Sequence, residues 1–107
     1  MVLPLIAGFV GGLLIGSLIA VAFLAYEEII DWFDEYLDTI HSSKNNLAFT
    51  IKDELENGNY QIVQGIFNQR TGDMIESREI EAEEIDEELL KVHEEYEDED
   101  GIVLYEI

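Results

Sequence analysis

The sequence predicts an α+β protein in three parts: a single N-terminal transmembrane helix, an acidic amphipathic helix that continues from it, and a small β-β-β-α-β domain. Three observations support this prediction. Residues 2–25 contain no charged side chain, residues 23–40 repeat apolar side chains at helical spacing, and from residue 47 onward the apolar period changes to two. The expected boundaries are 1–26 for the transmembrane helix, 27–46 for the acidic juxtamembrane helix and linker, and 47–107 for the domain.

The apolar run from residue 3 to residue 25 is 23 residues long. At a rise of ~1.5 Å per residue, a helix of this length measures about 34 Å, which is enough to cross a bilayer. We therefore expect contact with membrane lipid and a single-pass membrane localisation, with the acidic part on the cytoplasmic side. A cleaved signal peptide is a rival interpretation, because Ala20-Val21-Ala22 has the small-x-small form of a cleavage site. A buried helix of a globular protein is the third.

Small residues recur every four positions in this run, at Gly8, Gly12, Gly16 and Ala20. Such a stripe lets helix backbones approach closely, which favours association of helices in lipid. The spacing predicts self-association or docking onto a partner helix.

Residues 27–40 combine an acidic face with an apolar one. Ile30, Phe33, Leu37 and Ile40 fall at the a and d positions of a heptad, which indicates a coiled-coil seam. The alternative is that these side chains pack under the chain's own domain.

The third part carries clear strand and turn signals. Alternation predicts strands over residues 47–52, 60–67 and 74–82, with an Asn-Gly turn at 57–58 and a Thr-Gly turn at 71–72. A helix is expected over 87–96 with Asp86 as its N-cap, and a last strand over 102–107.

Charge excludes one class of function and suggests another. The chain has 25 acidic and 5 basic residues, a net charge of −20, so it repels DNA and RNA. Residues 76–100 are the most acidic segment, and their carboxylates form a candidate docking surface for a basic protein partner, or simply a solvated face. The candidate docking residues are Glu83, Glu84, Glu87, Glu88, Glu94 and Glu95.

No motif for catalysis or metal binding stands out. Aligning Gly101 with the invariant glycine of a calcium loop places Tyr96 and Ile107 where acidic ligands are required. Asp38 and His41 share a helical face, but the second copy that a di-metal bundle needs is absent from the sequence. We expect no enzyme activity, no cofactor and no metal.

The most favoured function is therefore a membrane-anchored interaction protein or accessory subunit. It associates through its glycine-striped helix, as a homo-oligomer or in a complex with a basic protein. A homo-oligomeric channel with an acidic collar at residues 27–38 is the alternative. An exported acidic domain is a third hypothesis, which requires that the apolar run be a cleaved signal.

Overall fold

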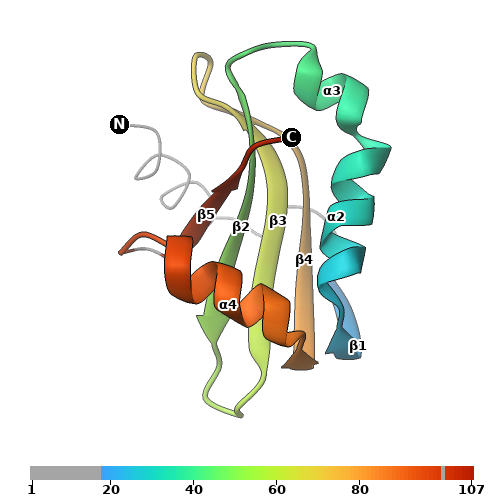
Figure 1. Ribbon diagram of the computed structural model, residues 1–107, viewed down its shortest axis with the longest axis vertical. Helices are drawn as coiled ribbons and strands as arrows, with labels where there is room; N and C mark the ends of the chain where they lie inside the picture. Colours follow the sequence, from blue (N-terminus) through green and yellow to red (C-terminus); the bar gives the residue numbers. More distant parts are fainter. Residues whose placement is uncertain (1–17, 100) are drawn as a thin grey trace.

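The computed structural model describes residues 18–99 and 101–107 of the chain (Figure 1). The N-terminal segment and residue 100 lie outside the described part. The elements in chain order are β1 (Leu18–Leu24), α2 (Tyr26–Glu35), α3 (Leu37–His41), β2 (Asn46–Glu54), β3 (Tyr60–Asn68), β4 (Asp73–Ile85), α4 (Glu87–Tyr96) and β5 (Ile102–Tyr105). The class is α+β, with strands and a helix at the expected places from residue 46 onward.

The strands form one mixed sheet in the order β1-β4-β3-β2-β5. β2, β3 and β4 are joined by hairpins, whose turns contain Gly58 (φ 88°) and Gly72 (φ 77°). These left-handed conformations are the ones that glycine adopts at least cost, which is why the two predicted turns form where they do. β1 pairs with β4 in parallel and β5 pairs with β2 antiparallel, so that β1 and β5 form the two edges of the sheet as far as residues 18–99 and 101–107 build it.

Within the described residues, the helices α2, α3 and α4 all lie on one face of the sheet (Figure 1). The alternation along β3 shows how the two faces divide: Ile62 and Ile66 point toward the helices, and Val63 and Phe67 point to the other side. The helix-covered core cluster consists of Leu24, Ile29, Phe33, Ile40, Ala48, Ile62, Ile66, Ile80, Ala82, Ile85 and Leu89. On the opposite face, Phe49, Val63, Phe67 and Ile102 form a second buried cluster.

Polar bonds fix α2 on the sheet. The buried amide of Gln64 in β3 donates to the carbonyl of Ile29 at 2.7 Å and accepts from Arg78 Nε of β4 at 2.8 Å. The same guanidinium lies 5.5 Å from the ring of Trp32 and donates to the carbonyl of Glu28 at 3.2 Å. Because buried polar groups must be paired, this chain of bonds determines where α2 lies.

The prediction of a transmembrane helix over residues 1–26 is wrong. Leu18–Leu24 is a strand in register with β4, from Leu18 opposite Glu79 to Leu24 opposite Ile85. No helix within residues 18–99 and 101–107 is long and apolar enough to cross a membrane. The physical reason is that the backbone N–H and C=O groups of an apolar run can form hydrogen bonds either within a helix or with a neighbouring strand. Here β4 is the neighbouring strand.

Three further predictions depended on that helix. The single-pass membrane localisation, with its cytoplasmic orientation, is corrected with it, and the predicted contact with membrane lipid loses its basis. The alternative of a channel also requires a membrane span and stays a prediction. Gly8, Gly12 and Gly16 lie outside the described residues, whereas Ala20 lies in the middle of β1 rather than on a helix.

The acidic helix does not continue from a preceding helix. It begins at Tyr26 after the strand and is interrupted at Tyr36, which separates α2 from α3. Of the predicted seam, Phe33 and Ile40 are buried in the core under the sheet, and Ile30 and Leu37 are half-buried. The alternative that the sequence left open, packing against the chain's own domain, accounts for these positions.

Candidate functional site

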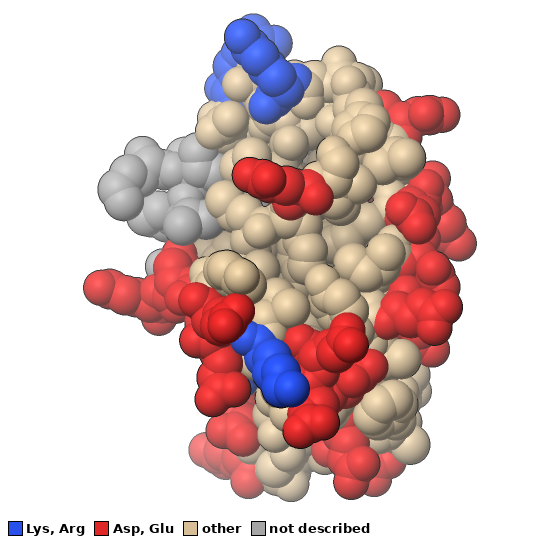
Figure 2. Space-filling model, in the orientation of Figure 1, with Lys and Arg blue, Asp and Glu red and all other residues tan. Residues whose placement is uncertain are grey.

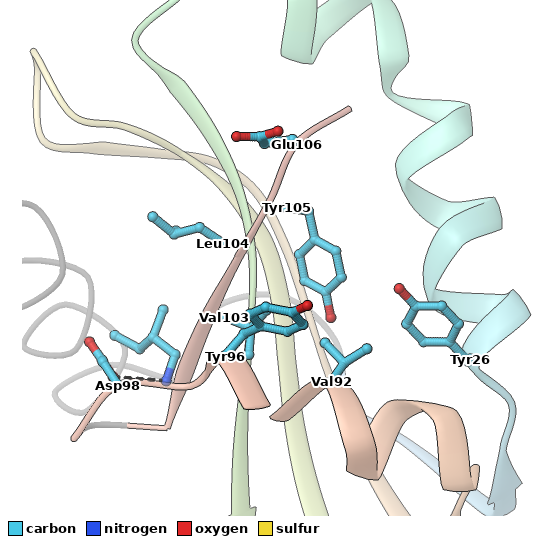
Figure 3. Close-up of a pocket in the computed structure, with 9 residues that line it drawn as sticks. Tyr26, Val92, Tyr96, Asp98, Val103, Leu104, Tyr105 and Glu106 are labelled. Atoms are coloured by element: carbon cyan, nitrogen blue, oxygen red, sulfur yellow. Dashed lines mark hydrogen bonds between the residues drawn. The ribbon is translucent and has the colours of Figure 1, made fainter. Parts of the chain in front are cut away.

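A hollow lies between α2 and α4, along the edge strand β5 (Figure 3). Its volume is about 480 Å³. Tyr26 comes from the first turn of α2, Val92 and Tyr96 from α4, and the remaining lining residues from β5 and its flanks. We call this hollow the β5 groove; its lining residues are Tyr26, Val92, Tyr96, Asp98, Ile102, Val103, Leu104, Tyr105 and Glu106.

Strand alternation explains how β5 forms the groove. Tyr105 extends toward the helices and Leu104 toward the other face, so the groove follows the outer edge of the strand (Figure 3). β5 pairs with β2 on its inner side, from Ile102 opposite Ile51 to Tyr105 opposite Ala48. Among the described residues no strand pairs with its outer side.

A buried hydrogen-bond network supports the wall of the groove. The hydroxyl of Thr50 in β2 lies 2.9 Å from His93 Nε2 and 2.7 Å from the hydroxyl of Tyr105. Thr50 and His93 are both 0% exposed. We call these three residues the Thr50 network. Tyr105 is its only member that lines the groove, so the network sets the position of that ring.

The network is neutral around pH 7. Burial, together with the charge of Lys52, lowers the pKa of His93 to about 4. Burial raises the pKa of Tyr105 to about 12, against a smaller lowering by its hydrogen bond to Thr50. The neutral forms prevail because desolvation penalises the charged ones. Tyr105 therefore presents a neutral ring and hydroxyl at the groove.

One nitrogen of His93 remains without a hydrogen bond. Nδ1 has no partner among the described residues, and the carboxylate of Glu97 lies 3.9 Å away. If Tyr105 donates to Thr50 and Thr50 donates to Nε2, the proton of His93 sits on Nδ1, facing this carboxylate. In that order the Nδ1–H of His93 faces the carboxylate of Glu97, which is a favourable arrangement of donor and acceptor. If the bonds ran in the opposite direction, Nε2 would carry the proton and the lone pair of Nδ1 would face the negative carboxylate.

Carboxylates flank the groove on two sides. On α4, Glu87, Glu88, Glu94 and Glu95 are exposed, and Glu83 and Glu84 are exposed at the end of β4. The outer side of α2 and α3 exposes Glu27, Glu28, Asp31, Asp34, Glu35 and Asp38. Figure 2 shows acidic side chains along the α2 side and across the region of α4, with a mostly uncharged area between them that contains one acidic side chain in its upper part.

The predicted acidic residues are thus on the surface, but the sequence did not indicate the groove between them. Thr50, His93 and Tyr105 were not singled out. On α4, Tyr96 is 68% exposed, whereas His93 is buried, four residues after the buried Leu89. A helical spacing of four from a buried leucine was the available signal.

Comparisons with protein-family models, curated proteins and solved structures found no match for this chain. The geometry and charge of the chain itself are therefore the basis for a function.

Proposed function

We propose that this domain binds a basic segment of another protein in the β5 groove. The observation that carries the proposal is the juxtaposition of a mostly apolar hollow, lined by three tyrosines and by the acidic residues Asp98 and Glu106, with the carboxylate-rich outer sides of α2 and α4. The net charge of −20 fits the same kind of partner.

The two parts of the surface contribute differently to binding. Carboxylates on the rim speed the encounter with a cationic partner and orient it, but exposed ion pairs add little affinity. Affinity comes from a desolvated anchor, and a hollow of about 480 Å³ accommodates one large side chain or two smaller ones. The exposed ring of Tyr96 and the half-buried ring of Tyr26 also attract a cation through their ring quadrupoles. The favoured ligand is a segment that alternates lysine or arginine with apolar residues.

The proposal is tested with a short fluorescent peptide of lysine and leucine residues, followed by fluorescence anisotropy. Because any anionic protein attracts such a peptide, the test compares two variants that each remove two negative charges. Glu94→Gln with Glu95→Gln alters the rim of the groove. Asp73→Asn with Glu76→Gln alters exposed positions on β4, close to the β3–β4 turn.

We expect the rim variant to raise Kd about 3- to 10-fold and the β4 variant to change it less than about twofold. Tyr96→Ala, which changes no charge, should weaken binding by a similar factor at both low and high salt. Equal losses in the two charge variants would mean that only net charge attracts the peptide, and would refute the groove as the binding site.

A further inference from the structure

The edge strand β1 is an exposed, entirely apolar strand on an anionic chain. Its sequence is LIAVAFL, so all seven residues are apolar. Leu18 is 58% exposed and Phe23 is 52% exposed. β1 pairs with β4 on one side, and no strand pairs with its other side among residues 18–99 and 101–107.

Such an edge is prone to pair with another strand. Its outer row of N–H and C=O groups has no strand partner among the described residues, and proteins commonly block such rows with lysine, proline or an inward-pointing charge. β1 contains none of these. At seven residues it is also longer than β5, the four-residue strand at the opposite edge.

We propose that β1 pairs with β1 of a second copy of the chain, across a two-fold axis perpendicular to the sheet. In this arrangement the strands run antiparallel and are centred on Val21. Leu18 then lies opposite Leu24, Ile19 opposite Phe23, and Ala20 opposite Ala22. Every opposed pair is apolar, and a two-fold axis makes the contact self-complementary.

The uncharged, apolar sequence of the strand favours this occupant over others. A second copy offers an uncharged strand of matching length, so no carboxylate has to enter the contact. The nearest acidic residues in the register, Glu79, Glu81 and Glu84, lie one strand further in, on β4. Between two copies they are separated by about three strand spacings, roughly 14 Å, which is beyond the ~8 Å screening length at physiological salt.

The two five-stranded sheets would then form one continuous sheet of ten strands. Both helical layers lie on the same face, because the axis maps each face onto itself. The outer sides of α2 then approach their symmetry mates, and their carboxylates repel one another. Dimerisation should therefore strengthen as salt rises, whereas binding of a basic peptide in the β5 groove should weaken. This opposite salt dependence separates the two proposals.

The test is the mass of the full chain in solution, measured by light scattering and sedimentation at about 50 mM and about 500 mM salt. We expect a dimer that is more populated at the higher salt. Ala20→Lys and Ala22→Glu, both at exposed positions of β1, should each raise the dimer Kd about tenfold or more, because each buries an uncompensated charge.

The double variant provides the decisive comparison. In the proposed register the lysine of one copy faces the glutamate of the other, so Ala20→Lys with Ala22→Glu should restore the dimer. Circular dichroism confirms that each variant is folded. A chain that stays monomeric at high salt, a dimer that survives both single substitutions, or a double variant that fails to recover it would each overturn the proposal.

Discussion

The two faces of the sheet are buried by different kinds of side chain. The face under the helices combines an apolar cluster with three fully buried polar side chains, Thr50, Gln64 and His93, each of which is hydrogen-bonded. The buried cluster on the opposite face is built from Phe49, Val63, Phe67 and Ile102 and is entirely apolar. The comparison predicts that the polar groups under the helices make the stability of the fold depend on pH and on single hydroxyl groups. The apolar cluster on the opposite face should make it depend on the volume of the buried side chains.

The largest effect is expected on the apolar face. Phe49 is 0% exposed, and its ring lies against Gly65, where an added Cβ would come within 3.0 Å of two ring carbons. Phe49→Ala should lower the free energy of unfolding by about 3–5 kcal/mol, through lost burial and the cavity left behind. Urea denaturation measures this loss, which should be the same at about pH 7.5 and about pH 5.5 because no titrating group is involved.

Leu104→Ala serves as a control on the same side of the sheet. Leu104 is 44% exposed, so its truncation should cost less than about 1 kcal/mol. A loss for Phe49→Ala as small as that of Leu104→Ala would contradict the description of a packed cluster on this face.

Because of His93 on the helix-covered face, the free energy of unfolding of the domain should decrease as the pH falls. The pKa of His93 is about 4 in the fold, against 6.5 in the unfolded chain. Between pH 6.5 and about pH 4 the imidazole of His93 binds a proton in the unfolded chain but not in the folded one, so the free energy of unfolding decreases as the pH falls. Below about pH 4 both states bind this proton, and His93 causes no further change. The full loss is about 3 kcal/mol.

His93→Gln isolates this contribution, since glutamine does not titrate and the surface carboxylates are common to both proteins. The difference in unfolding free energy between wild type and variant should shrink as the pH falls from 7 to 4. A difference that stays constant across this range would show that His93 is not buried in its neutral form.

A pair of opposite substitutions sharpens the comparison further. Thr50→Val removes a hydroxyl from the polar face and leaves His93 Nε2 and the hydroxyl of Tyr105 unpaired, at a cost of about 1–3 kcal/mol. Val63→Thr adds a hydroxyl to the apolar face, where Val63 is 6% exposed, at a similar cost of about 1–3 kcal/mol.

Thermal denaturation of both variants measures these losses, and Thr50→Ser, which keeps the hydroxyl, should lose less than Thr50→Val. If Thr50→Val or Val63→Thr stabilised the domain, the description of one face as hydrogen-bonded and the other as apolar would be wrong at that position.

Local signals explain which parts of the fold the sequence could predict. The hairpin at Gly58, the helix over residues 87–96 and its cap at Asp86 depend on neighbours within a few residues, and all three were predictable. The strand β1 was not, because its partners on β4 lie about sixty residues away, and a short apolar run fits a helix or a buried strand equally well. The groove was missed for the same reason, since Tyr26, Tyr96 and Tyr105 meet only through the sheet order.

The smallest effect concerns a single carboxylate that joins the two helices flanking the groove. Asp86 accepts from the backbone N–H of Glu88 at 3.1 Å, as the predicted N-cap of α4, and also from the N–H of Tyr26 at 3.1 Å, at the start of α2. These two bonds, the one to Tyr26 more strongly, lower the pKa of Asp86 below its ordinary 3.8. Its contribution to stability is therefore complete above about pH 4 and is lost as the pH falls through the lower, folded value.

Asp86→Ala should destabilise the domain less than Thr50→Val does, because Asp86 lies near the surface and water can replace it. Hydrogen exchange should nevertheless become faster at both Tyr26 and Glu88, and remain unchanged at Leu90, whose N–H bonds to the backbone carbonyl of residue 86. Tyr26 bonds to Oδ2 of Asp86 and Glu88 bonds to Oδ1, so Asp86→Asn, which keeps a single acceptor oxygen, should protect one of the two amides near neutral pH and not both. In Asp86→Ala, faster exchange at Glu88 alone would mean that α2 is positioned by its apolar side and not by its bond to Asp86.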